Sequence, residues 1–118
     1  MLIITLRSVT MESEDIEGSL VKYYDGKAVN AIVGIKSEMD KVDSLSKTLA
    51  GNPSIRDVFI VTGDFDIIIK VRFPEFWNLH EFLVDELIKL PGVRETKTMM
   101  VLSTLKDSGN STTMGWKQ

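Results

Sequence analysis

The sequence predicts an α+β fold in which four strands and two helices follow one another as β-α-β-β-α-β. Residues 28–36, 55–62, 66–73 and 93–105 have the alternating or β-branched composition of strands. The segments that follow the first and third of them repeat apolar residues at helical spacing. The link between the two middle strands is so short that they must pair antiparallel, because a parallel pair needs a crossover of about a dozen residues.

The first strand, AVNAIVGIK (28–36), is followed by a helix that runs to about Ala50. Ser37 opens a capping box that Asp40 closes at the start of this helix. Gly51-Asn52-Pro53 ends it. The apolar stripe of the helix consists of Met39, Val42, Leu45 and Leu49.

The two middle strands are joined at Thr62-Gly63-Asp64-Phe65, and a second helix follows Pro74. Asn78 is expected to cap that helix, with Glu81 three residues further on. Leu90-Pro91-Gly92 stops it, because a helix does not continue comfortably into proline. The predicted apolar stripe is Leu79, Phe82, Leu83, Leu87 and Leu90.

This order is typical of a ferredoxin-like fold, which places both helices on one face of an antiparallel sheet. The opposite face then carries apolar residues, together with Lys70 and Arg72. An apolar sheet face of this size is expected to pack against a second copy, as in dimeric α+β barrels. The apolar residues assigned to this face are Ile32, Gly34, Val58, Ile60, Ile68 and either Met99 or Met100.

The ends of the chain are assigned separately from the predicted domain at 28–105. Residues 1–27 are expected to hold an extra N-terminal strand at 19–24, which the Asp25-Gly26 step folds back onto 28–33 as a hairpin. The polar tail 106–118 is expected to be flexible.

Composition excludes several functional classes for this chain of 118 residues. Its 14 Lys and Arg against 17 Asp and Glu give a net charge of −3, which argues against direct binding to DNA or other nucleic acid. With no cysteine and a single histidine, His80, neither a metal site nor a cofactor is expected. Without a membrane span or a secretory signal, the predicted location is the cytoplasm.

Three motifs in the second half of the chain resemble those of the effector-binding module of the Lrp/AsnC family of transcription regulators. These are VTGDFD (61–66) with the apolar strand after it, LPGV (90–93), and Thr96-Lys97-Thr98 before MMVL. That module is the regulation-of-amino-acid-metabolism (RAM) domain, and the family shares the β-α-β-β-α-β order. The resemblance extends over residues 28–105.

The resemblance implies a sensor and not an enzyme, with a small amino acid or related metabolite as effector. Members that bind DNA carry an N-terminal helix-turn-helix, which needs about 45 to 50 residues at ordinary helix and loop lengths, and only 27 precede the module here. The resemblance therefore predicts a stand-alone effector module. The implied partners are a second copy, a higher ring such as an octamer, and full-length Lrp/AsnC regulators.

Each candidate site residue has a structural alternative. Gly63 and Asp66 either shape the turn, or the bare backbone at Gly63 lets a small zwitterion approach while the Asp66 carboxylate meets its ammonium. The resemblance implies that this turn lies at the effector site, and Asp64 within it is a further candidate ligand-binding residue. Thr96 and Thr98 are either ordinary strand residues or hydroxyls beside the effector. A final pair, Met99 and Met100, either fills the core or shapes the pocket.

Two other functions remain open from the sequence. A small α+β barrel enzyme, of monooxygenase or haem-degrading type, would use His80, Trp77 and Phe76 to line a pocket. An assembly module without any ligand is the third possibility.

Overall fold

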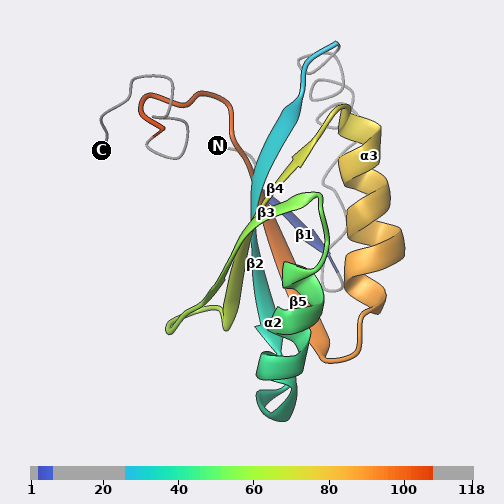
Figure 1. The fold of residues 1–118 in the computed structure, drawn as a ribbon, viewed down its shortest axis with the longest axis vertical. Coiled ribbons are helices and arrows are strands. Elements are labelled where there is room, and N and C mark those ends of the chain that lie inside the picture. The colour runs from blue at the N-terminus through green and yellow to red at the C-terminus, as the bar shows by residue number, and fades with distance from the viewer. Residues whose placement is uncertain (1–2, 7–25, 108–118) are drawn as a thin grey trace.

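The computed structural model of this chain describes residues 3–6 and 26–107. It has five strands in the spatial order β1-β5-β2-β4-β3, with every neighbouring pair antiparallel. Figure 1 shows that α2 and α3 both cover one face of this sheet and leave the other uncovered, which confirms the predicted α+β, ferredoxin-like fold. The strands are β1 (Ile3–Leu6), β2 (Val29–Ser37), β3 (Ile55–Ile60), β4 (Ile67–Phe73) and β5 (Val93–Met100), and the longer helices are α2 (Val42–Ala50) and α3 (Phe76–Glu81).

Strand β2 is the centre of the sheet, and its alternation is that predicted from the sequence. It pairs with β4 over Val29–Ile35 and with β5 from Ala31 onward. The side chains that it turns toward the helices are all buried, whereas the opposite face of β2 is the uncovered side. We call this uncovered side of the sheet the open face. The buried positions are Val29, Ala31, Val33 and Ile35.

The extra N-terminal strand expected at 19–24 lies outside the described residues. Its expected partner, 28–33, already pairs with β4 on one side, and from Ala31 it pairs with β5 on the other. Along 31–33 both edges of β2 are thus occupied by described strands. The N-terminal strand that the structure describes is β1, which extends the sheet beyond β5.

Strand β3 contains a register shift that reverses part of the prediction. Ile55 lies opposite Val71, but Asp57 lies opposite Lys70, so one extra residue is inserted between them. As a result Val58 and Ile60 align with the core positions of β4, and their predicted place on the open face is wrong. The residue that occupies the open face instead is Phe59, opposite Ile68.

The first helical segment begins differently from the predicted capping box. Ser37 belongs to β2, and its hydroxyl donates to the carbonyl oxygen of Glu38, so it does not cap a helix. A short 3₁₀ turn, η1 (Met39–Lys41), comes before α2. Met39 is 89% exposed, so its place in the buried stripe is also wrong.

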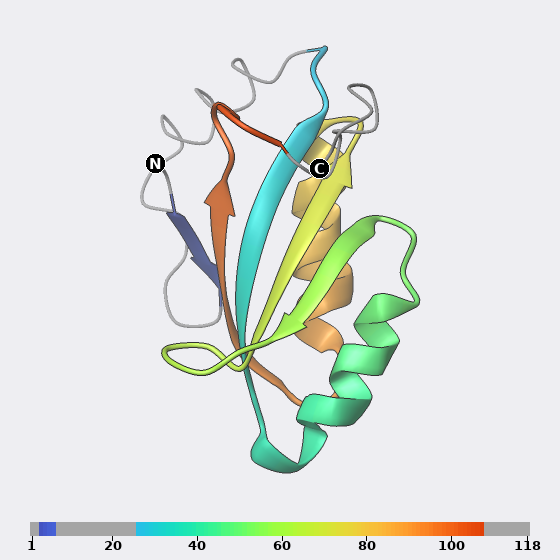
Figure 2. The ribbon, with the colours of Figure 1, turned by 60° about the vertical axis from the view of Figure 1, so that its left-hand side comes forward.

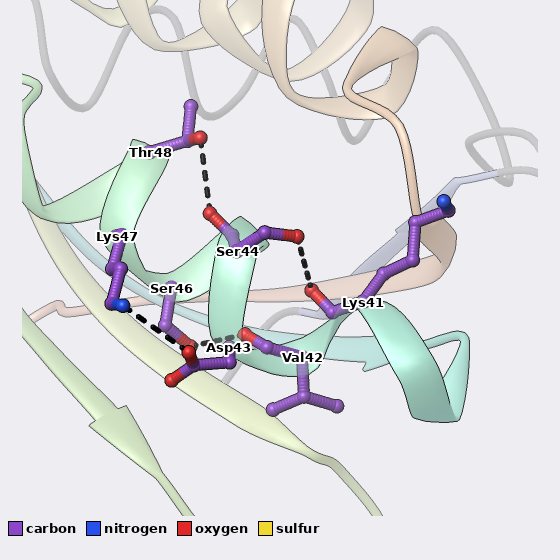
Figure 3. Close-up of polar contacts among 7 residues, drawn as sticks. All are labelled: Lys41, Val42, Asp43, Ser44, Ser46, Lys47 and Thr48. Carbon is purple, nitrogen blue, oxygen red and sulfur yellow. Dashed lines mark hydrogen bonds and ion pairs between the residues drawn. The ribbon is translucent and has the colours of Figure 1, made fainter.

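The polar side chains of helix α2 form hydrogen bonds with the backbone of the same helical segment. Figure 3 shows the Ser44, Ser46 and Thr48 hydroxyls donating to carbonyl oxygens three or four residues earlier, at 2.7–3.2 Å. An ion pair joins Lys47 to Asp43 at 3.3 Å, one turn apart. These polar groups already have partners within the helix, so we place no part of the candidate site on it.

The second helical segment starts two residues earlier than the predicted cap. Glu75 precedes the first helical residue of α3 without a side-chain cap, and Asn78 lies inside the helix. The segment then widens into a π-helical turn, η2 (Phe82–Glu86), and tightens into a 3₁₀ turn, η3 (Leu87–Lys89). The predicted stripe nevertheless faces the core, because Leu79, Phe82, Leu83 and Leu87 are buried and Leu90 packs against them.

Strand β5 ends at Met100, five residues before the predicted end at 105. Residues 101–107 continue without regular structure on the open side of the sheet (Figure 1). The predicted flexible tail beyond residue 107 lies outside the described residues. Within the part of the chain that the structure describes, no helix is long and apolar enough to cross a membrane.

Candidate functional site

The turn between β3 and β4 carries three of the predicted site residues. Its ends are closed by a hydrogen bond of 2.9 Å from the Val61 amide to the carbonyl oxygen of Asp66. Gly63 has a φ of +117°, a conformation that side chains rarely adopt, and no described atom lies within 4 Å of where its Cβ would be. The glycine is therefore required by the backbone conformation, and the space beside it is open. Asp64, next along the turn, is exposed.

Asp66 attaches this turn to the end of β2. Its Oδ2 accepts a hydrogen bond of 2.9 Å from the Ser37 amide, and its own amide donates to the carbonyl oxygen of Ile35 at 3.0 Å. The structural interpretation of Asp66, as a residue that shapes the turn through hydrogen bonds, is thus correct for Oδ2. Among the described residues, no group donates a hydrogen bond to the other oxygen, Oδ1.

Phe65 is a site neighbour that the sequence did not single out. A Cβ built on Gly34 would lie 2.8 Å from three atoms of the Phe65 ring. Because Val33 and Ile35 point into the core, the Phe65 ring must lie against the open side of Gly34. The sequence signal was available, since a glycine inside an apolar strand often marks a close approach.

Thr96 and Thr98 lie on the helix side of the sheet, opposite Ile35 and Val33. Both are fully buried, and neither Oγ1 has a hydrogen-bond partner among the residues that the structure describes. A buried hydroxyl without a partner costs about 1–3 kcal/mol. A bound polar molecule that forms hydrogen bonds with these two hydroxyls would remove this cost.

The two methionines separate onto opposite faces. Met99 is half-buried on the open face, opposite Ile32, whereas Met100 is buried in the core opposite Ala31. The core interpretation thus holds for Met100. Met99 remains a candidate for shaping a surface.

The seven predicted residues do not converge on one pocket within a single chain. Asp66 and Thr96 lie on either side of Ile35, two strand spacings or roughly 10 Å apart. Thr96 turns its hydroxyl into the helix layer, while Gly63 and Asp64 lie exposed at the turn. The structure therefore brings together Gly63, Asp64 and Asp66, with Thr96 at the same end of the sheet.

The aromatic residues of α3 do not form a shared pocket either. Trp77 makes edge-to-face contacts with Phe76 and His80, each with ring centroids 5.6 Å apart. Phe76 is buried and Trp77 is 50% exposed, so these rings fill the helix–sheet boundary by contact with one another. In the described parts of the chain, no group of three His, Cys, Asp or Glu side chains is placed to hold a metal ion.

Comparison with known proteins identifies the domain that this arrangement builds. A profile of the Lrp/AsnC ligand binding domain matches residues 30–111. The chain belongs to the Lrp/AsnC family. This confirms the resemblance predicted from VTGDFD, LPGV and the threonine pair.

The Lrp/AsnC relatives of this chain are transcriptional regulators. The regulator FL11 of Pyrococcus horikoshii is 35% identical over 83 residues, which cover 70% of this chain and 54% of FL11. The leucine-responsive regulatory protein of Escherichia coli is 37% identical over 54 residues, covering 46% of this chain and 33% of that protein. The chain thus spans about half or less of the length of these two relatives.

Solved Lrp/AsnC structures share the fold at lower identity. AsnC of Escherichia coli superposes with a TM-score of 0.64 at 18% identity, covering 86% of this chain and 64% of AsnC. A transcriptional regulator of Neisseria meningitidis in complex with L-methionine gives 0.63 at 17% identity, covering 86% of this chain and 62% of that one. These matches establish the common architecture.

Proposed function

We propose that this Lrp/AsnC domain is a non-enzymatic sensor that binds a small amino acid or a related metabolite at the β3–β4 turn. The observation that carries the proposal is the open backbone at Gly63 beside the carboxylates of Asp64 and Asp66. Backbone amides there suit the carboxylate of a zwitterion, and a free carboxylate oxygen suits its ammonium. The relative solved with L-methionine supports an amino acid as the ligand class.

The remaining candidate residues border this proposed site without completing it. Thr96 and Thr98 hold buried hydroxyls that lack partners among the described residues, so they are available to a polar group that reaches the helix side of the sheet. Met99 and Met100 would shape the surroundings of the ligand from the two faces. A second copy of the chain supplies the missing wall in this proposal.

The open face supports association with that second copy. No described helix covers it (Figure 1), and strands β2 to β5 place apolar side chains on it. Two such faces would bury each other in a homodimer, and dimers would join into a ring around the β3–β4 turns. The apolar members of the face are Ile32, Phe59, Ile68 and Met99.

Ligand binding would act through this assembly. A ligand shifts an equilibrium only by the difference in its affinity for the two states. An effector held between dimers therefore favours the larger assembly, and the same change would alter mixed oligomers with full-length Lrp/AsnC regulators.

Calorimetry with each of the twenty amino acids tests the proposal. We expect at least one to bind, with affinity lowered about tenfold or more in Asp64→Asn and Asp66→Asn because each loses a charge-assisted hydrogen bond. Asp85→Asn, an exposed carboxylate on η2, is the matched control and should bind like the parent chain. Light scattering should show a larger assembly with the bound ligand.

Two results would overturn the sensor. If no amino acid binds while light scattering still shows oligomers, the chain is an assembly module without a ligand. If haemin gives a Soret shift that His80→Ala abolishes, the enzyme alternative is correct. We expect no such shift, because Phe76 is buried and its ring is in contact with that of Trp77.

A further inference from the structure

The end of β2 lies between the two turns that carry the VTGDFD and LPGV motifs. Figure 2 shows the β3–β4 turn, the end of β2 and the start of β5 together at the lower end of the sheet. The Ser37 amide donates to Asp66 Oδ2 at 2.9 Å, and the Glu38 amide donates to the carbonyl oxygen of Gly92, also at 2.9 Å. Two consecutive residues therefore join the proposed effector turn to the LPGV turn.

The Asp66 carboxylate takes the place of a missing strand partner. Strand β4 begins at Ile67, which lies opposite Ile35. Amides of a strand point to alternate sides, so the Ser37 amide points to the β4 side beyond the last paired residue. Ser37 is buried, and a buried amide needs an acceptor, which Asp66 Oδ2 supplies. This bond fixes one oxygen of the carboxylate, and with it the place of Oδ1, which the proposed ligand ammonium would use.

The LPGV turn holds the Gly92 carbonyl in a defined place. The Val93 amide donates to the carbonyl oxygen of Leu90 at 3.2 Å, and Gly92 has a φ of +97°. Proline at the second position and a positive φ at the third are typical of a type II turn. A Cβ at Gly92 would also lie only 2.7 Å from the Cβ of Lys41. Both the backbone conformation and the close contact therefore favour glycine here.

Glu38 is held at both its amide and its carbonyl group. Its carbonyl oxygen accepts hydrogen bonds of 2.9 Å from the Ser37 hydroxyl and from the Lys41 amide, while its own amide binds Gly92. Lys41 in turn packs against Gly92. Because Ser37 directly precedes Glu38, a shift of Glu38 moves the Ser37 amide as well.

We propose that the LPGV turn positions the carboxylate of the effector site. Gly92 holds Glu38, Glu38 holds the Ser37 amide in place, and that amide orients Asp66. This inference rests on the amino-acid site of the proposed function. Glu38 and Gly92 are positioning residues, since they act on the ligand through Asp66. Two motifs that lie far apart in the sequence would thus serve one site.

Glu38→Pro tests this link, because proline has no amide hydrogen and its ring occupies the space toward the Gly92 carbonyl. The Glu38 φ of −63° suits proline, and Ser37 has the extended conformation that a residue before proline prefers. We expect the Ser37 amide to exchange with solvent about tenfold faster, as measured by NMR. The affinity for whichever of the twenty amino acids binds the parent chain in calorimetry should also fall about tenfold.

Two further variants separate positioning from general stability. Glu38→Ala removes the same exposed side chain but keeps the amide, so it should change neither the exchange of Ser37 nor the affinity. Pro91→Ala loosens the LPGV turn at an exposed position and should speed the exchange of Ser37 by about twofold to fivefold. In all three variants the Val33 amide, in the middle of β2, should exchange as in the parent chain.

The outcomes distinguish this inference from the proposed function. Retained protection of Ser37 in Glu38→Pro, or faster exchange with unchanged affinity, overturns the positioning role and leaves the sensor intact. Equal acceleration at Val33 and Ser37 would show a loss of strand stability and overturn it as well. If none of the twenty amino acids binds the parent chain, the proposed function fails and the positioning role fails with it.

Discussion

At the residue scale, the candidate site depends on side chains that have a structural task as well as a proposed functional one. Phe65 covers Gly34, and Asp66 binds the Ser37 amide. Thr96 and Thr98 show the opposite situation, since their hydroxyls are buried and the described protein gives them nothing to bond. Substitutions can separate these two kinds of residue.

Gly34→Ala should lower the free energy of unfolding by about 1–3 kcal/mol, as forced overpacking does. The new Cβ would lie 2.8 Å from the Phe65 ring, so the ring must move away from β2. Urea denaturation measures the change. In a Phe65→Ala background the same substitution should be much less harmful, and an equal loss in both backgrounds would show that the ring is not the obstacle.

Thr98→Val should raise the free energy of unfolding by about 1 kcal/mol, because it keeps the side-chain shape and removes a buried hydroxyl without a described partner. Thermal unfolding of the ligand-free chain measures it. Thr48→Val, on the exposed side of α2, provides the comparison and should not be stabilising, since the Thr48 hydroxyl donates to Ser44. A loss of stability in Thr98→Val would mean that the hydroxyl has a partner in solution.

At the scale of elements, Asp66 directly precedes strand β4, and its hydrogen bonds hold the start of that strand to the end of β2. The Ser37 amide donates to the carboxylate, and the Asp66 amide donates back to Ile35. The turn that carries Gly63 is therefore anchored to the central strand at one point. This anchor decides how firmly the proposed site is positioned.

Asp66→Ala should expose the Ser37 amide to hydrogen exchange and lower stability by about 1–2 kcal/mol, the range for one lost hydrogen bond of a partly buried carboxylate. Hydrogen exchange read by NMR reports the Ser37 amide directly. Asp64→Ala, two residues earlier and exposed, should leave that amide protected. Unchanged protection of the Ser37 amide in Asp66→Ala would show that this carboxylate does not anchor the turn to β2.

The elements also show what the sequence can and cannot predict. Alternation located β2 and β4 to within a residue, because their core positions are strictly periodic. The β3 register shift was not predictable, since one inserted residue leaves no mark in the hydrophobic pattern yet moves Val58 to the other face. Helix starts were also misplaced, because Ser37 belongs to β2 and its hydroxyl donates to the carbonyl oxygen of Glu38, and Asn78 lies inside α3.

The candidate site was predictable only in part. Gly63 and Asp66 were found through a motif, and the positive φ and the bond to Ser37 explain why that motif has those residues. Gly34 inside its apolar strand signals that something approaches closely, but the partner, Phe65, lies far away in the sequence, so the local pattern does not identify it.

At the scale of the whole molecule, the sheet has one covered face and one open face, and the proposed functions depend on the open one. The β3–β4 turn lies at one end of it (Figure 2), and Lys70 and Arg72 of β4 lie toward the other. The proposed second copy would pack on the apolar residues of this face, Ile32, Phe59, Ile68 and Met99. Charge and hydrophobicity are thus divided along a single surface.

Phe59 and Ile60 allow this surface to be tested with neighbouring residues of β3. Phe59 is on the open face opposite Ile68, whereas Ile60 is on the helix side, and both are substantially exposed, at 45% and 59%. If copies pair through their open faces, Phe59→Glu should place two charges in a buried interface and convert dimers to monomers. Ile60→Glu should leave the dimer intact, as measured by light scattering at several protein concentrations. Equal dissociation by both variants, or by neither, would place the interface on another surface of the domain.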